Sequence, residues 1–314
     1  MNEHFADRLI AELERKRCYL AVGLDPDLSH MPPEMLDGVT DFASAGRAAE
    51  KFCTAIIDGV SDIVAVVKPQ SAFFEQFGSD GMAALERVID HARNAGLLVL
   101  EDAKRGDIGS TMAAYSAAIL GRVEIGGRPV PVQDVDAVTV SPYLGPESLA
   151  PMLAAADAWG KGVFVLVRTS NPGSGQLQML ETNRGRLFET VAESVDELGA
   201  TRLGERGYSN VGAVTGLTYP EDAPLLRTAM PRAFFLVPGL GAQGGQPRDF
   251  PLFLNDDGLG AIVASSRAIA SGWSQNGTVP GSILKQVREG AELAARRSGL
   301  ALQQALVGAD RWLW

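Results

Sequence analysis

The stretch LLVLEDAKRGDIGST (97–111) begins as an apolar run and ends in a cluster of charged residues. An uninterrupted run of Leu and Val is typical of a strand that is buried on both faces. Seven further runs rich in Val, Ile, Leu and Phe share this character, each bounded by Gly, Pro or polar residues: CYLAVGLD (18–25), IVAVVKPQ (63–70), AVTVSPYL (137–144), GVFVLVRTS (162–170), VGAVTGLT (211–218), AFFLVPGLG (233–241) and AIVASSR (261–267). The sequence therefore predicts eight buried strands.

Helix-like stretches with apolar residues at three- and four-residue spacing lie between most of these runs. They are 42–59, 80–95, 110–120, 146–158 and 185–199, followed by a C-terminal stretch at 281–306. This alternation predicts an α/β fold, a (β/α)8 TIM barrel rather than a doubly wound open sheet. We expect residues 1–314 to form one barrel domain with an additional helix at each end.

Two connections depart from the regular pattern. The stretch GRVEIGGRPVPVQD (121–134) is too rich in Gly and Pro for a helix, so it predicts a loop or hairpin inserted before the fourth strand. Residues 246–258 contain two prolines and an Asp-Asp-Gly, so the helix between the seventh and eighth strands is expected to be short or distorted.

Composition excludes several classes of partner. The chain of 314 residues carries 38 acidic against 28 basic side chains, a formal charge of −10, and has no basic block. Such a surface repels polyanions, so neither nucleic acid nor a membrane is an expected partner. The charged N-terminal stretch lacks the apolar region of a secretory signal. Only Cys18 and Cys53 are present, which suits a reducing compartment, and a cytoplasmic location is predicted.

Polar residues gather where the predicted strands end. Active sites of TIM barrels lie at the carboxyl ends of the strands, so such residues are candidates for the site. They are Asp25 after the first run, Lys68 after the second, Asp102 and Lys104 after the third, Ser170 after the fifth, Gln243 after the seventh and Arg267 after the eighth.

The third strand carries the most informative pair. Asp102 and Lys104 are two residues apart, and a two-residue period places both side chains on one face of a strand. If Val99 and Glu101 face the helices, Asp102 and Lys104 point into the mouth of the barrel, and Asp107 follows in the loop. A D-x-K-x-x-D string is usually a solvated turn with a local ion pair.

The positions of Lys68 and Asp25 favour a functional interpretation of this string. The chain has only six lysines, and Lys68 and Lys104 are the two embedded at the ends of apolar strands. Asp25 stands at the equivalent place on the first strand, so charges of alternating sign are expected to converge in one mouth.

These charges suit one kind of chemistry. Flanking aspartates favour the ammonium form of Lys104, which fits a cation that stabilises negative charge developing on carbon and then delivers a proton. A carboxylate at Asp102 beside an anionic substrate group would disfavour that group before it departs as a neutral molecule. Loss of carbon dioxide fits this description.

A second set of residues predicts a phosphate site. The glycine-rich stretch PGLGAQGG (238–245) follows the seventh strand, and phosphate commonly binds at the loops after the seventh and eighth strands of such barrels. Arg267 would offer a bidentate charged partner, and Gln243 could bridge the phosphate to another part of the ligand. Ser170 lies in an SNPGSG turn that could read a polar edge of the ligand, although such a turn is more often only structural.

With these motifs in order, the sequence resembles the orotidine 5′-phosphate decarboxylase family, in particular its longer bacterial subfamily. The resemblance covers nearly the whole chain. It rests on VGLDPDLS (22–29), VKPQSAFFEQFG (67–78), LEDAKRGDIGSTMAAY (100–115), AVTVSPYLG (137–145), VLVRTSNPGSGQLQ (165–178), VPGLGAQGG (237–245) and SSR (265–267). One departure is Ser141, where the subfamily motif leads us to expect Asn.

The resemblance implies a role for each candidate residue. Lys104 would donate a proton to C6 of the pyrimidine and Asp102 would face the substrate carboxylate. Lys68 and Asp25 would hold the ribose and complete the charge network. The remaining contacts implied are Ser170 to the pyrimidine, Gln243 between phosphate and base, Arg267 to phosphate, and Asp107 with Thr111 to the ribose in the neighbouring site of a homodimer. The substrate would be a nucleotide, orotidine 5′-monophosphate (OMP), and neither a metal nor a cofactor is expected.

Two alternatives stay open. One is another phosphate-substrate enzyme of the same superfamily, such as a magnesium-dependent sugar-phosphate decarboxylase or an aldolase. Those relatives typically place an acidic residue near the second strand, and Lys68 argues against them. The other is a non-catalytic barrel that binds a phosphate ligand, which would not need Lys104 between two aspartates.

Overall fold

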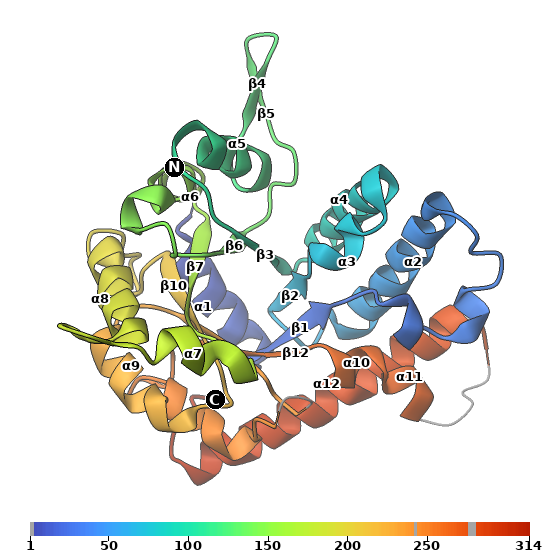
Figure 1. Ribbon diagram of the computed structural model, residues 1–314. Coiled ribbons are helices and arrows are strands. Elements are labelled where there is room, and N and C mark those ends of the chain that lie inside the picture. Colours follow the sequence, from blue (N-terminus) through green and yellow to red (C-terminus); the bar gives the residue numbers. More distant parts are fainter. Residues whose placement is uncertain (1–2, 242–243, 276–280) are drawn as a thin grey trace.

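Eight parallel strands close into a barrel in the computed structural model, which describes residues 3–241, 244–275 and 281–314 (Figure 1). Around the barrel the order is β1-β12-β11-β10-β7-β6-β3-β2, so the last strand pairs with the first. The predicted (β/α)8 fold is confirmed. The strands are β1 (Leu20–Leu24), β2 (Val66–Pro69), β3 (Leu98–Arg105), β6 (Ala137–Val140), β7 (Gly162–Arg168), β10 (Val211–Thr215), β11 (Phe235–Pro238) and β12 (Ala261–Ser265).

Helices surround the barrel and follow its strands in the chain (Figure 1). The longer ones are α1 (Phe5–Lys16), α2 (Phe42–Val60), α4 (Gly78–Asn94), α5 (Gly109–Ile119), α6 (Ala150–Trp159), α8 (Leu187–Gly199), α9 (Ala223–Ala229) and α12 (Ile283–Gly308). Single turns form α3 (Ala72–Glu75), α7 (Gly175–Gln178), α10 (Arg267–Ala270) and α11 (Gly272–Gln275). In the described ranges we find no helix whose length and apolarity would let it span a bilayer.

The irregular connections follow the sequence closely. The insertion before the fourth barrel strand is a hairpin of β4 (Val123–Ile125) and β5 (Arg128–Val130), which projects beside α5 (Figure 1). The predicted distorted helix is the 3₁₀ helix Pro247–Phe253, with a proline inside it. The short α9 and a hairpin of β8 (Glu181–Thr182) and β9 (Gly185–Arg186) were not predicted, and neither were the single turns α3, α7 and α11. All of them are too short to produce a clear period. Other 3₁₀ turns span Leu28–His30, Pro33–Met35, Pro146–Leu149, Pro172–Ser174 and Pro220–Asp222.

Helix α1 closes the amino-terminal end of the barrel. Its residues Phe5, Leu9 and Leu13 are buried and belong to the same cluster as the side chains inside the barrel. The Phe5 ring meets Phe164 of β7 edge-on, with ring centroids 5.9 Å apart. A Cβ at Gly162 would lie 2.5 Å from the Phe5 ring, so only glycine lets the helix pack this closely. One end of the barrel is thereby filled with apolar side chains.

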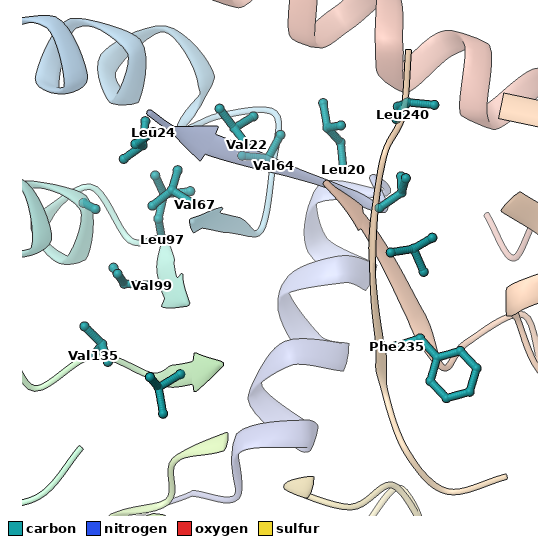
Figure 2. Close-up of a cluster of buried hydrophobic side chains, with 14 of the residues drawn as sticks. Leu20, Val22, Leu24, Val64, Val67, Leu97, Val99, Val135, Phe235 and Leu240 are labelled. Carbon is teal, nitrogen blue, oxygen red and sulfur yellow. The ribbon is translucent and has the colours of Figure 1, made fainter. Parts of the chain in front are cut away.

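The outer faces of the strands pack against the helices in a second apolar layer. Figure 2 shows part of it, where Leu20, Val22, Leu24, Val67 and Val99 lie together on neighbouring strands. Because alternate residues of each strand enter the inner and outer layers, both faces are apolar, and this produces the unbroken apolar runs in the sequence. The carboxyl ends of the strands are the part of the barrel left for polar groups.

Candidate functional site

A cavity of about 800 Å³ opens at the carboxyl ends of the barrel strands. Its lining combines polar groups with apolar side chains from β7, β10 and β11, so it offers both charged partners and a dry wall to a ligand. The predicted site residues that line it are Asp25, Lys68, Asp102, Lys104, Ser170 and Arg267. Ser141, the departure from the family motif, lines it as well.

The Asp102 carboxylate is the centre of the charged part of the cavity. Its Oδ2 accepts hydrogen bonds from Lys68 Nζ at 2.9 Å and from Gln70 Nε2 at 3.1 Å. Its Oδ1 accepts from Lys104 Nζ at 2.6 Å and from Thr139 Oγ1 at 2.9 Å. Each oxygen therefore has one ammonium and one neutral donor. This arrangement compensates a carboxylate that is only 8% exposed.

Mutual charge pairing fixes the protonation of the buried groups. Burial opposes the charged form of Asp102, but the ammonium groups of Lys68 and Lys104 outweigh it and hold the pKa of Asp102 well below its usual range. Burial likewise opposes the charged form of Lys68, yet Asp102 and Asp25 together raise its pKa. At neutral pH the network thus contains an ionised Asp102 and a protonated Lys68.

Asp25 differs from Asp102 in its surroundings. It lies after β1 and lines the same cavity, and its carboxylate favours the charged form of the Lys68 ammonium. Its Oδ1 atom is buried and has no hydrogen-bond partner among the groups of the described residues. A buried acceptor of this kind is costly unless a donor reaches it. Asp25 is therefore available to a hydroxyl or amine of a ligand.

Strand β3 brings Asp102 and Lys104 together in an unexpected way. Leu98 and Leu100 face the barrel interior and Val99 faces the helices, as the two-residue period predicts. At Lys104 the backbone is left-handed, with φ of 48°, and the pairing with β6 shifts register. The structure brings Asp102 and Lys104 together as predicted, whereas nothing in the sequence indicated the left-handed backbone at Lys104. A bulge, which redirects a strand, aims the Lys104 side chain.

The loop that carries Ser170 is anchored by Arg168 and by close packing against Gly216. Arg168, at the end of β7, is buried; its Nε donates to Asp222 at 2.9 Å and its guanidinium lies over the Tyr219 ring. A Cβ at Gly216 would lie 3.0 Å from the Ser170 Cβ, so the loop rests directly on the backbone of the next strand's end. These contacts, and not the turn alone, fix the loop that places Ser170 in the cavity lining.

Part of the predicted phosphate site also lines this cavity. Arg267 begins α10 and lines the cavity together with Gly239, whose φ of 110° is accessible only to glycine. Gly23 of β1 also matters, because its Cβ would lie 1.8 Å from Ser266 Oγ. Glycine there lets the turn after β12 close against β1. Gln243 lies outside the described residues.

Asp107 and Thr111 are placed away from the cavity of their own chain. Neither contributes to its lining, and Asp107 Oδ1 accepts a hydrogen bond from the Ile108 amide. Asp107 lies between β3 and α5, and Thr111 lies in the first turn of α5. Ile108, which precedes this helix, and Tyr115 on it are 60% and 37% exposed. Six of the nine candidate residues therefore line the cavity, Asp107 and Thr111 do not, and the ninth, Gln243, belongs to the residues that are not described.

Two contacts of Asp102 were missed in the sequence. Gln70 follows Lys68 by two residues in VKPQ, so the strand period already placed both side chains on one face. Thr139 was visible as the polar residue within the apolar AVTV run of the fourth strand. Both signals are weak unless the residues on the neighbouring strand are known, since an isolated Gln or Thr in a strand is common.

Metal ligation is a separate question for this site. Within the described ranges, no group of three or more His, Cys, Asp or Glu side chains could hold a metal ion. Both oxygens of Asp102 already accept hydrogen bonds from Lys68 and Lys104, so a cation there would have to displace an ammonium group.

Comparison with known proteins reveals extensive similarity. Residues 19–272 match the orotidine 5′-phosphate decarboxylase/HUMPS family. The orotidine 5′-phosphate decarboxylase of Rhodopirellula baltica is 48% identical over 267 residues, covering 84% of this chain and 87% of the relative. That of Deinococcus radiodurans is 37% identical over 310 residues, covering 98% and 99%. The OMP decarboxylase structure of Leishmania donovani aligns with a TM-score of 0.73 at 31% identity, covering 99% of this chain and 100% of that one.

Proposed function

The chain belongs to the orotidine 5′-phosphate decarboxylase/HUMPS family and is a carboxy-lyase, and from this premise we propose that it converts OMP into UMP and carbon dioxide. This is the final decarboxylation that yields UMP in pyrimidine biosynthesis. The observation that carries the proposal is the Lys68–Asp102–Lys104 network on the wall of the cavity. The network joins the buried Asp102 carboxylate to the Lys104 ammonium, the proposed proton donor.

The proposed reaction uses the network in one step. The C6–carboxylate bond breaks, carbon dioxide leaves, and its bonding electron pair stays on C6. The Lys104 ammonium stabilises that charge and transfers a proton to C6, becoming an amine that solvent protonates again. The Lys104 side chain is 45% exposed, which suits both the transfer and the later exchange with water.

Asp102 acts on the substrate before the bond breaks. Its low pKa keeps it ionised, so the substrate carboxylate placed against it meets a like charge. That repulsion disappears as the carboxylate leaves as neutral carbon dioxide, so the interaction is less unfavourable in the transition state than in the ground state.

The other cavity residues would bind the nucleotide. The unpartnered Oδ1 of Asp25 suits a ribose hydroxyl, and Lys68 lies beside it. Arg267 would pair with the phosphate and Ser170 with the pyrimidine edge. The role of Gln243, between phosphate and base, stays a prediction from the sequence.

The decisive assay follows OMP by its absorbance in the presence of EDTA, with UMP identified by chromatography. We expect full turnover without added metal, because protein side chains alone supply the charges and the proton. An absolute requirement for magnesium, or turnover of a sugar phosphate instead of OMP, would favour the other enzyme class of the superfamily. Binding of UMP with no turnover of OMP would favour a non-catalytic barrel.

We also propose a homodimer in which Asp107 and Thr111 enter the neighbouring site. In its own chain Asp107 does not line the cavity, and the adjacent Ile108 and Tyr115 leave apolar surface exposed at the start of α5. A second copy covering this face would bury that surface and bring Asp107 near a cavity.

Mixing inactive subunits tests the shared site. Lys104→Ala and Asp107→Ala subunits, combined in equal amounts, should regain activity at about a quarter of the sites, because half the dimers are mixed and each has one intact site. Lys104→Ala mixed with wild type at the same ratio keeps half of its sites intact with or without exchange, so it sets the activity scale of the assay. If exchange is demonstrated by mass spectrometry and no activity returns, the sites are independent.

A further inference from the structure

Thr139 is a polar residue in an otherwise apolar barrel strand. It lies in β6 and is fully buried, while its neighbours Val138 and Val140 enter the outer apolar layer. Its side chain therefore faces the interior of the barrel, toward β3. A buried hydroxyl is stable in such a place only if its hydrogen bonds are made there.

The Thr139 hydroxyl makes two hydrogen bonds of opposite sense. It accepts one from the backbone amide of Lys104 at 3.0 Å, and it donates one to Asp102 Oδ1 at 2.9 Å. The direction is fixed, because an amide can only donate and an ionised carboxylate can only accept. The same Asp102 oxygen holds the Lys104 ammonium at 2.6 Å. One hydroxyl thus connects both ends of Lys104 to the network.

The pairing of β3 with β6 explains why this hydroxyl is needed. Glu101 pairs with Val138, but the next pair is Arg105 with Val140, so residues 102–104 lie opposite Thr139 alone. In this bulge Lys104 adopts φ of 48°, a left-handed conformation that is unfavourable for a residue other than glycine. Its amide is bound by the Thr139 side chain in place of a ladder carbonyl.

We propose that Thr139 is a positioning residue for proton transfer by Lys104. This inference rests on the proposed decarboxylation. Asp102 and Lys104 line the cavity and Thr139 stands behind them, acting through the Lys104 backbone and the Asp102 carboxylate. When Lys104 has given up its proton, the hydroxyl still holds Asp102 Oδ1 and the Lys104 amide. The amine therefore keeps its place for reprotonation and the next substrate.

Three variants separate this role from simple packing. Thr139→Val keeps the branched shape and removes the hydroxyl, whereas Thr139→Ser keeps the hydroxyl and removes a methyl group. Thr215→Val is the matched control, because Thr215 is also fully buried in a barrel strand, where its Oγ1 has no hydrogen-bond partner among the described residues. The measurements are kcat and KM for OMP and thermal unfolding.

We expect Thr139→Val to lower kcat between about 10-fold and 100-fold with KM changed by less than about twofold, because misplaced reacting groups slow the chemical step. Thr139→Ser should return to within about threefold of wild type, and Thr215→Val should match wild type. Wild-type kcat in Thr139→Val, or an equal loss in the Val and Ser variants, would overturn the proposal.

A measurement that does not depend on turnover tests the role of Thr139 separately from the proposed function. Amide hydrogen exchange at Lys104 should be slow in wild type and in Thr139→Ser and at least about tenfold faster in Thr139→Val, since the amide has lost its acceptor. If wild type does not turn over OMP, the proposed function fails and the positioning role for it fails too. If wild type is active but Lys104 exchange is the same in all variants, only the role of Thr139 fails.

Discussion

Replacing Lys104 with alanine is expected to lower kcat for decarboxylation of OMP by about 10³-fold or more. General acids of this kind contribute about 10²-fold to 10⁴-fold, and this lysine also supplies the charge that faces the developing carbanion. The variant should keep its fold, because the Lys104 side chain is 45% exposed and Asp102 keeps Lys68, Gln70 and Thr139 as donors.

The comparison that isolates the effect uses a second lysine. Lys51→Ala removes an exposed ammonium from α2, outside the cavity lining, and should leave kcat unchanged. Both variants are assayed for turnover and for UMP binding by calorimetry. Equal turnover of wild type and Lys104→Ala would remove Lys104 from the reaction.

Replacing Asp102 with asparagine is expected to destabilise the fold by about 3 kcal/mol, in addition to abolishing turnover. The Lys68 side chain is 6% exposed, so loss of its carboxylate partner leaves a buried ammonium poorly compensated. Lys68→Met in the same chain should recover most of the loss, because the uncompensated charge is then removed as well. Urea unfolding of the two single variants and the double variant measures this coupling.

A surface ion pair supplies the matched control. Glu193→Gln breaks the exposed pair with Arg184, and its effect on the free energy of unfolding should be at most about 0.5 kcal/mol. Additive effects of the Asp102 and Lys68 variants would show that the two charges do not support each other.

The stability of the fold in acid should also depend on the Asp102–Lys68 pair. The folded-state pKa of Asp102 lies below the ordinary value of 3.8, so its contribution to stability is complete above that value and declines as the pH falls below it. The Asp102→Asn variant should therefore lose less stability than wild type over that acid range.

The barrel was predictable because the sequence pattern of each strand and helix depends mainly on its own residues. Strands buried on both faces give continuous apolar runs such as 162–170, and the helices between them keep a period of three to four residues. The hairpin at 121–134 and the distorted helix near 246–258 also followed from Gly and Pro chemistry. Elements of a few residues, such as α7 and β8, have no period to detect.

The charged site was predictable only in part. Strand ends identified Lys68, Asp102 and Lys104, because the barrel brings all strand ends to one mouth. The left-handed backbone at Lys104 depends on the register between β3 and β6, which the residues of neither strand reveal alone. Thr139 acquires its role only through that register.

The central claim is that Lys104 moves a proton to and from C6 of the pyrimidine, and hydrogen exchange into UMP tests it most directly. A catalyst that protonates C6 in one direction must also remove that proton in the other, so wild type should exchange the C6 hydrogen of UMP for deuterium in D₂O. Proton NMR follows the loss of the C6 signal. We predict exchange with wild type and with Lys51→Ala, and none above the uncatalysed rate with Lys104→Ala. Equal exchange rates in wild type and Lys104→Ala would contradict the account.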